Sequence, residues 1–317
     1  MGKVAFVFPG QASQYPGMGK ELAEKYPAAR AVFDEADKAL GFSVSKMCFE
    51  GTEEELKQTA NTQPAILTVS VAAFRVLEEK GITADYVAGH SLGEYSALVA
   101  AGSLKFADAV RLVRKRGTYM QEAVPAGQGS MAAIMGLSPA VVLDACKRAA
   151  AGEVCAAANL NSPDQTVISG NVGAVKRAVE IASQSGAKRA VVLSVSAPFH
   201  SELMMPAQEK LEKDLKATHF ADLQMPLVTN VDADTIRKGE EAQSALVRQV
   251  TMAVRWEESM RMLLDEGVNT FVEVGPGRVL TGLMRQIERS VTTLNVEDEK
   301  TLMGTLEKIT GAKSDAA

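Results

Sequence analysis

A serine lies between two glycines in the segment GHSLG at residues 89–93, a spacing that is typical of an activated nucleophile. The residues before it, YVAG, predict a short strand, and those after it, LGEYSALVAA, predict a helix. A sharp strand-to-helix turn admits only small neighbours and projects the serine oxygen outward. The unpaired amides that open the helix favour a developing oxyanion. Ser91 is therefore predicted to be a catalytic nucleophile, and the alternative is an ordinary turn in which it caps the helix.

A serine hydroxyl needs a neighbouring base, and the chain has three histidines. His90 is next to Ser91, where the turn should point the two side chains apart, so we expect it to support the turn. His219 lies in a polar connector and is expected at the surface. His200 lies in SAPFHSELMMP, between an inserted unit and a new helix, where cleft residues are often found. We predict that His200 is the base rather than a structural histidine.

No acidic residue stands out as the third member of a hydrolase triad. Glu94 and Glu202 are close in sequence to the serine and the histidine, but each is placed as an acid in the first turn of a helix. We therefore expect a Ser–His pair that is oriented by a neutral group.

The remaining candidates are weaker on their own. Arg116 ends the basic run RLVRKR, and without further information a surface arginine on a solvated helix face is the simpler interpretation. The segment GPG at 275–277 precedes a helix but lacks the spacing of a nucleotide-binding loop. Asn159 and Asn161 could face a cleft or serve in a turn.

Strand-like and helical segments alternate along most of the chain, which predicts an α/β fold with a parallel sheet covered by helices. The pattern changes between about 124 and 197, where the order is strand, helix, strand, strand, helix, strand. That order is typical of a ferredoxin-like unit. We predict a large α/β-hydrolase-like domain from residues 1–124 plus 198–317, a ferredoxin-like small domain at 125–197, and an active site between them.

Composition narrows the class of protein. Of the 317 residues, 46% are hydrophobic and 23% are charged, as in a globular protein. A formal net charge of −5 argues against a general nucleic-acid binder. The three cysteines have no metal-site spacing, so no metal is expected and reduced thiols in a cytoplasmic protein are predicted. No apolar run is long enough to cross a bilayer, and the start lacks the features of a signal peptide, so no membrane association is expected.

A family resemblance covers nearly the whole chain. Its motifs occur in order as FVFPGQASQ (6–14), NTQPAI (61–66), GHSLGEYSAL (89–98), RGTYMQEAVP (116–125), NLNSPDQTVISG (159–170), APFHSELM (197–204), QVTMAVRW (249–256) and VEVGPGRVLTGL (272–283). With these motifs the chain resembles the malonyl-CoA:acyl carrier protein transacylases of bacterial fatty acid synthesis. The resemblance implies transfer of malonyl from malonyl-CoA to the phosphopantetheine thiol of acyl carrier protein, and no cofactor, because the coenzyme A thioester is a substrate.

The resemblance also implies roles for residues at matching positions. Ser91 would carry the malonyl ester, and His200 would act as base and then as acid. The backbone amides of Gln11 and Leu92 would form the oxyanion hole. The backbone carbonyl of Gln249 would orient the histidine, which accounts for the missing acid.

Substrate selection would depend on two further positions. Arg116 would pair with the free carboxylate of malonyl, and an arginine can hold a carboxylate with two parallel bonds. Phe199 matches the members that select malonyl over branched groups. Two alternatives remain. A serine hydrolase or thioesterase would use a clear acidic partner and have no need of Arg116, and a non-catalytic relative would form no acyl-enzyme.

Overall fold

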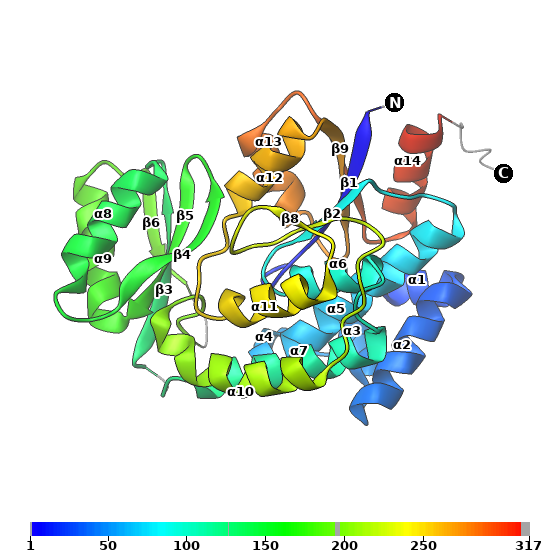
Figure 1. Cartoon of the computed structure of the whole chain (residues 1–317), viewed down its shortest axis with the longest axis horizontal. Coiled ribbons are helices and arrows are strands. Elements are labelled where there is room, and N and C mark those ends of the chain that lie inside the picture. Colours follow the sequence, from blue (N-terminus) through cyan, green and yellow to red (C-terminus); the bar gives the residue numbers. More distant parts are fainter. Residues whose placement is uncertain (1, 126, 194–196, 312–317) are drawn as a thin grey trace.

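A six-stranded sheet forms the centre of the larger part of the molecule (Figure 1). The computed structural model describes residues 2–125, 127–193 and 197–311. The strands lie in the order β10-β9-β1-β2-β7-β8, and every pairing is parallel except that of β7 with β8. Their bounds are β1 Lys3–Phe8, β2 Tyr86–Gly89, β7 Leu227–Val228, β8 Thr235–Ile236, β9 Val268–Val274 and β10 Thr292–Val296. The predicted α/β class with a largely parallel sheet is confirmed.

Helices cover both faces of this sheet. Strand β1 accordingly carries apolar side chains on both of its sides. Phe6 and Phe8 point into a core shared with helix α5 (Thr59–Glu79), where both rings meet Phe74 edge-on at 6.3 and 6.4 Å. Ala5 and Val7 point the other way, into a second core with helices α12 (Trp256–Asp265) and α13 (Val279–Ile287). The helices of this part are α1 Lys20–Lys25, α2 Pro27–Leu40, α3 Val44–Glu50, α4 Glu53–Lys57, α5 Thr59–Glu79, α6 Gly93–Ala100, α7 Phe106–Glu122, α10 Met205–Ala217, α11 Gly239–Gln249, α12 Trp256–Asp265, α13 Val279–Ile287 and α14 Glu299–Thr310, with a short 3-10 turn at Glu202–Met204.

Residues 129–192 form a separate four-stranded sheet with two helices on one face (Figure 1). The strands lie in the order β4-β5-β3-β6, and all three pairings are antiparallel. In chain order the elements are β3 Gly129–Met135, α8 Pro139–Ala150, β4 Cys155–Ser162, β5 Gln165–Asn171, α9 Val172–Gln184 and β6 Arg189–Val192. The limits 125–197 stay a prediction, since residues 126 and 194–196 lie outside the described part of the chain.

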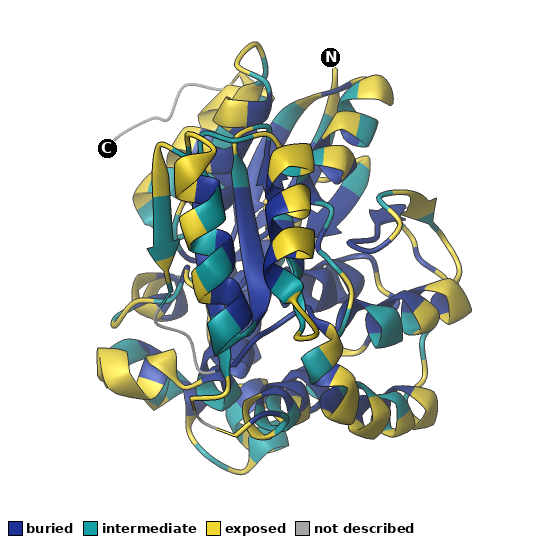
Figure 2. Cartoon of the chain, turned by 90° about the vertical axis from the view of Figure 1, so that its left-hand side faces the viewer, coloured by how far each residue is buried: buried dark blue, intermediate teal, exposed yellow. Residues whose placement is uncertain are grey.

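Strand β3 shows how this small sheet contributes to the site. Ala132 and Ile134 pack against α8 and α9, whereas the alternating Met131, Ala133 and Met135 line a pocket on the other face. Figure 2 views the two helices from outside and shows exposed residues along their outer sides and buried strands behind them. The helix-free face of the small sheet is therefore turned toward the large part of the molecule.

Within the described residues, no helix is long and apolar enough to cross a membrane. Cys48, Cys146 and Cys155 are free thiols. The described part of the chain also contains no group of three or more histidine, cysteine, aspartate or glutamate side chains that could hold a metal ion.

Candidate active site

Ser91 lies at the turn between β2 and α6, and two glycines make that turn possible. A Cβ atom on Gly89 would overlap the backbone of Gly93, and one on Gly93 would overlap the carbonyl of Phe8. Ser91 itself has a φ of 51°, in the left-handed region that residues other than glycine rarely adopt. Its backbone amide donates a 2.7 Å hydrogen bond to Oδ1 of Asn230. A strained serine held in this way is typical of a nucleophile at a strand-to-helix elbow.

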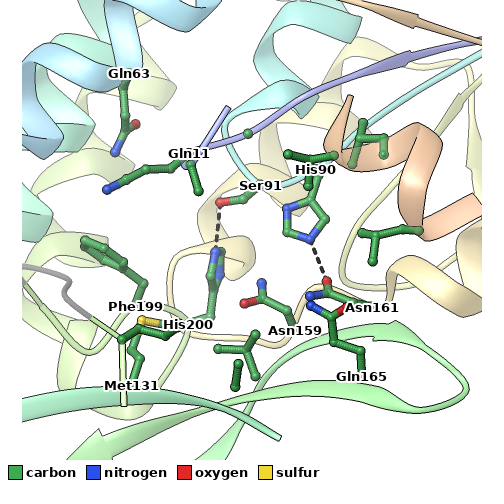
Figure 3. Close-up of a pocket in the computed structure, with 18 of the residues that line it drawn as sticks. Gln11, Gln63, His90, Ser91, Met131, Asn159, Asn161, Gln165, Phe199 and His200 are labelled. Carbon is green, nitrogen blue, oxygen red and sulfur yellow. Dashed lines mark hydrogen bonds between the residues drawn. The ribbon is translucent and has the colours of Figure 1, made fainter. Parts of the chain in front are cut away.

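His200 reaches the same point from the segment that precedes the 3-10 turn. Its Nε2 lies 2.8 Å from Oγ of Ser91 (Figure 3). Its Nδ1 lies 2.8 Å from the backbone carbonyl of Gln249 and 3.2 Å from that of Met252. A carbonyl can only accept, so Nδ1 carries the proton and the lone pair of Nε2 faces the serine. The ring is thus held in the form that can accept the serine proton.

The carbonyl of Gln249 is free for this contact because it ends helix α11. The last carbonyls of a helix have no intrahelical donor. No acid of the described residues contacts the imidazole: Glu202 is exposed, and Glu94 is buried but contacts other residues. A neutral backbone group therefore occupies the place that an acid takes in a hydrolase triad.

Burial keeps His200 neutral. Loss of solvent, and next the charge of the nearby Arg116, lower the pKa of His200 to about 3. A histidine with an ordinary pKa would be partly protonated near pH 6.5 and could not accept a proton in that form. At neutral pH this imidazole is fully in its basic form.

The lowered pKa predicts a pH dependence of stability. In the unfolded chain His200 titrates near pH 6.5, whereas in the folded protein it stays neutral down to about pH 3. Its contribution to the free energy of unfolding is therefore complete above pH 6.5 and is lost as the pH falls toward 3. Between pH 7 and pH 5, wild type should lose on the order of 1–2 kcal/mol more unfolding free energy than His200→Gln. Urea unfolding of both proteins at the two pH values measures the difference. Equal losses would contradict a depressed pKa at His200.

Arg116 is buried in the same site, so the interpretation as a surface arginine is wrong. Its Nη1 donates to Oε1 of Gln63 at 2.8 Å. Its Nη2 donates to Oε1 of Gln249 at 2.9 Å and to Oγ of Ser91 at 3.1 Å. Helices α5 and α7 approach closely here, since a Cβ on Gly117 would overlap the backbone of α5. The guanidinium therefore lies directly beside the serine oxygen, away from bulk water.

The amides of Gln11 and Leu92 are placed on the loops that flank the serine. Gln11 follows β1, in a loop that packs so tightly on the elbow that a Cβ on Gly10 would meet the carbonyl of His90. Leu92 directly precedes the first residue of α6. Neither backbone amide donates to another described residue. Two free N–H groups at a turn and a helix start are suited to a developing negative charge.

A pocket of about 340 Å³ joins these groups to the small sheet (Figure 3). One wall is apolar and includes Met131, Val167 and the buried Phe199. Asn159 and Asn161 from β4 also line the pocket, which answers the question left open by the sequence. The lining residues are Gly10, Gln11, Ala12, Gln63, His90, Ser91, Arg116, Met120, Met131, Ala133, Met135, Asn159, Asn161, Gln165, Val167, Leu193, Phe199, His200, Val279, Leu280 and Leu283.

The other two histidines lie apart from the serine oxygen. His90 points away from Ser91, and its Nε2 lies 2.9 Å from Oδ1 of Asn161 (Figure 3). Its ring also lies against Trp256, with centroids 5.4 Å apart. His219 is exposed on a connector after α10. His90 thus links the elbow to the small sheet.

Sequence reasoning missed Asn230 and Gln63. Asn230 accepts from the amide of Ser91 and donates to the carbonyl of Gly89 at 2.7 Å, so it clamps both sides of the elbow. Its position two residues beyond β7 was a usable signal, because the carboxyl ends of neighbouring parallel strands meet at one edge. Gln63 lies inside α5, and nothing in its local sequence shows that it faces Arg116.

Comparison with known proteins identifies the family. The acyl transferase domain family matches residues 5–316. A malonyl CoA-acyl carrier protein transacylase of Bacillus subtilis (strain 168) is 51% identical over 303 residues, which are 95% of this chain and 96% of the relative. This chain belongs to the malonyl CoA-acyl carrier protein transacylase family.

Solved structures of family members have the same fold. The transacylase of Coxiella burnetii matches with a TM-score of 0.95 at 42% identity, over 98% of both chains. A malonyl-transacylase solved in complex with a type II PKS acyl-carrier protein matches with a TM-score of 0.94 at 45% identity, over 96% of this chain and 99% of that one. The resemblance inferred from the motifs is confirmed.

Proposed function

We propose that this enzyme transfers the malonyl group of malonyl-CoA to the phosphopantetheine thiol of acyl carrier protein through an ester on Ser91. One observation carries the proposal: Oγ of Ser91 lies 2.8 Å from the basic nitrogen of His200 and 3.1 Å from the guanidinium of Arg116. The first contact supplies a base for the nucleophile. The second supplies a buried cation close to where the acyl group would be attached.

Each half-reaction follows from these contacts. His200 takes the proton of Ser91 as Oγ attacks the thioester carbonyl, and the amides of Gln11 and Leu92 receive the oxyanion. The C–S bond then breaks, and the imidazolium returns the proton to the departing coenzyme A thiolate. The carrier thiol reverses these steps: it gives its proton to His200 and attacks the ester carbonyl. The bond from that carbonyl to Oγ of Ser91 then breaks, and the imidazolium returns the proton to Oγ. The carbonyl of Gln249 holds the imidazole ring of His200 in the same orientation during both half-reactions.

Arg116 distinguishes this function from simple hydrolysis. A free carboxylate that enters the pocket loses water and needs a charged partner. We propose that Arg116 supplies it, and that the buried Phe199 limits bulk beside the acyl group. No further cofactor enters this scheme. The relatives are named for carrier-protein transfer, and one was solved with its carrier protein, which supports acyl carrier protein as the acceptor.

We also propose the finer description of the fold. The β3-α8-β4-β5-α9-β6 order and the antiparallel sheet β4-β5-β3-β6 support a ferredoxin-like small domain at 125–197. The elbow at the end of β2 supports an α/β-hydrolase-like large domain from 1–124 plus 198–317. The free thiols of Cys48, Cys146 and Cys155 support a cytoplasmic location.

Intact-mass measurement tests the ester. Brief mixing with malonyl-CoA should add the mass of one malonyl group to the enzyme and release free coenzyme A. Addition of acyl carrier protein in its phosphopantetheine form should then remove that mass and place it on the carrier. Steady-state kinetics should be ping-pong, because coenzyme A leaves before the carrier binds.

The same experiment separates the alternatives. A thioesterase would release free malonate at the same rate with and without the carrier. A non-catalytic relative would acquire no mass at all. Either outcome would overturn the transfer function.

A further inference from the structure

One buried carboxylate in the site has no part in the steps above. Glu94 lies in the first turn of α6, three residues after Ser91, and is only 1% exposed. Its Oε2 accepts a 2.7 Å hydrogen bond from Nε2 of Gln249 and a 3.1 Å bond from the amide of Asn230. Burial raises the pKa of Glu94 to about 7, although the hydrogen bonds from Gln249 and Asn230, and then the charge of Arg116, oppose the shift. Its other oxygen, Oε1, is buried and has no hydrogen-bond partner among the described residues, so the buried acid is only partly satisfied and its presence in the site carries a cost.

The side chain of Gln249 connects this acid to the guanidinium. Its Nε2 donates to Glu94 at 2.7 Å, and also to the backbone carbonyl of Ser91 at 3.0 Å and to Oδ1 of Asn230 at 3.3 Å. Its Oε1 accepts from Nη2 of Arg116 at 2.9 Å. Above pH 7 Glu94 is mostly ionised, and this is the form present in an assay at pH 8. A carboxylate can only accept and a guanidinium can only donate, so the amide between them has one satisfactory orientation. The reversed amide would set its NH₂ group against the guanidinium. Glu94 is the charged and nearest of the three acceptors, so it makes the largest contribution to fixing which end of Gln249 faces Arg116.

The charge of Glu94 also matters. Arg116 is buried, and no described carboxylate lies within ion-pair distance of it. Glu94 acts on it at longer range and offsets part of the burial that lowers the pKa of Arg116. A direct fork-to-fork pair would occupy the guanidinium and would have to be broken by any incoming carboxylate. An amide between the two groups keeps a compensating charge nearby and leaves the guanidinium able to exchange partners.

We propose that Glu94 is a positioning residue that sets carboxylate recognition by Arg116 through the side-chain amide of Gln249. The proposal rests on the proposed function, because it assigns Glu94 a part in recognition of the malonyl carboxylate. The side chain of Glu94 does not touch the reacting atoms, and Glu94 is not among the residues that line the pocket. Its effect is therefore on which acyl group is accepted.

The test is the ratio of acylation rates with malonyl-CoA and acetyl-CoA, measured by intact mass in single-turnover experiments. Glu94→Gln should lower this ratio about tenfold, because the weakened contact is charge-assisted and is used only by the carboxylate-bearing substrate. Glu273→Gln is the matched control. Glu273 is also a fully buried carboxylate that accepts two hydrogen bonds, from the amides of Leu280 and Thr281, and it has no contact with Arg116. Its ratio should equal that of wild type.

A double-variant comparison shows whether the effect passes through Arg116. In an Arg116→Ala background, Glu94→Gln should leave the ratio unchanged. If it lowers the ratio there as well, or leaves it unchanged in wild type, the proposal for Glu94 is wrong while Arg116 keeps its role. If Arg116→Ala alone does not change the ratio, the carboxylate role of Arg116 fails and this proposal fails with it.

A second variant covers the case in which Glu94→Gln does not fold. Gln249→Met removes the linking amide but keeps the backbone carbonyl that holds His200. It should lower the malonyl-to-acetyl ratio to a similar extent. An unchanged ratio in a folded Gln249→Met protein would also overturn the proposal.

Discussion

Replacing Ser91 with alanine should abolish acylation by malonyl-CoA, and His200→Ala should slow it about 10²- to 10⁴-fold, the usual range for loss of a general base. The reason is the 2.8 Å contact between Nε2 and Oγ, together with a pKa that keeps the imidazole basic. Acylation is followed by rapid mixing with malonyl-CoA and intact-mass analysis. No adduct should appear in Ser91→Ala, even after long exposure.

The two residues act as one unit, so their effects should not add. Ser91→Ala combined with His200→Ala should be no less active than Ser91→Ala alone. His219→Ala is the control, since that exposed histidine lies outside the pocket and should react like wild type. A malonyl adduct on another residue of Ser91→Ala would show that the nucleophile is misassigned.

The elbow could be predicted from the sequence because its determinants are local. Gly89, Ser91 and Gly93 are within five residues, and the overlaps that exclude a Cβ at both glycines follow from the turn itself. The strands of the small sheet were predictable for a similar reason, since a short apolar run such as MAAIM in β3 lies within a few consecutive residues.

The environment of Arg116 could not be predicted in this way. Its position on the buried side of α7 depends on the close approach of α5, and its partners Gln63 and Gln249 are 53 and 133 residues away. The basic run around it favours a surface position, and only the packing of the two helices decides otherwise. Before the fold was known, only the family resemblance indicated its role.

The group that orients His200 could not be predicted from the sequence for a different reason. It is a backbone carbonyl, and every residue has one, so no side-chain type marks it. What selects the carbonyl of Gln249 is the end of α11, where the helix leaves it without a donor. The absence of a suitable acid in the sequence indicated a neutral group, but the residues alone could not say which.

Arg116→Ala should lower malonyl transfer steeply and leave acetyl transfer similar or improved. The malonyl carboxylate must leave water to enter the pocket, and loss of its buried, hydrogen-bonded partner costs about 2–5 kcal/mol. At about 1.4 kcal/mol per tenfold, this is roughly 30-fold to several thousand-fold in rate. An acetyl group makes no such bond. Acetyl transfer is therefore affected only through the loss of the 3.1 Å contact between Arg116 and Ser91 in the variant enzyme. The measurement is kcat/KM for malonyl-CoA and for acetyl-CoA with the same carrier protein.

Two further variants decide how Arg116 acts. Arg116→Lys should recover only part of malonyl transfer, because an ammonium lacks the planar fork that reaches Gln63, Gln249 and Ser91 from two nitrogens. Arg111→Ala, on the exposed side of the same helix, should behave like wild type with both substrates. Unfolding temperatures of all variants check that the fold is kept. If the malonyl-to-acetyl ratio of Arg116→Ala equals that of wild type, another group reads the carboxylate, and the buried guanidinium serves only to hold Gln249 and Ser91 in place.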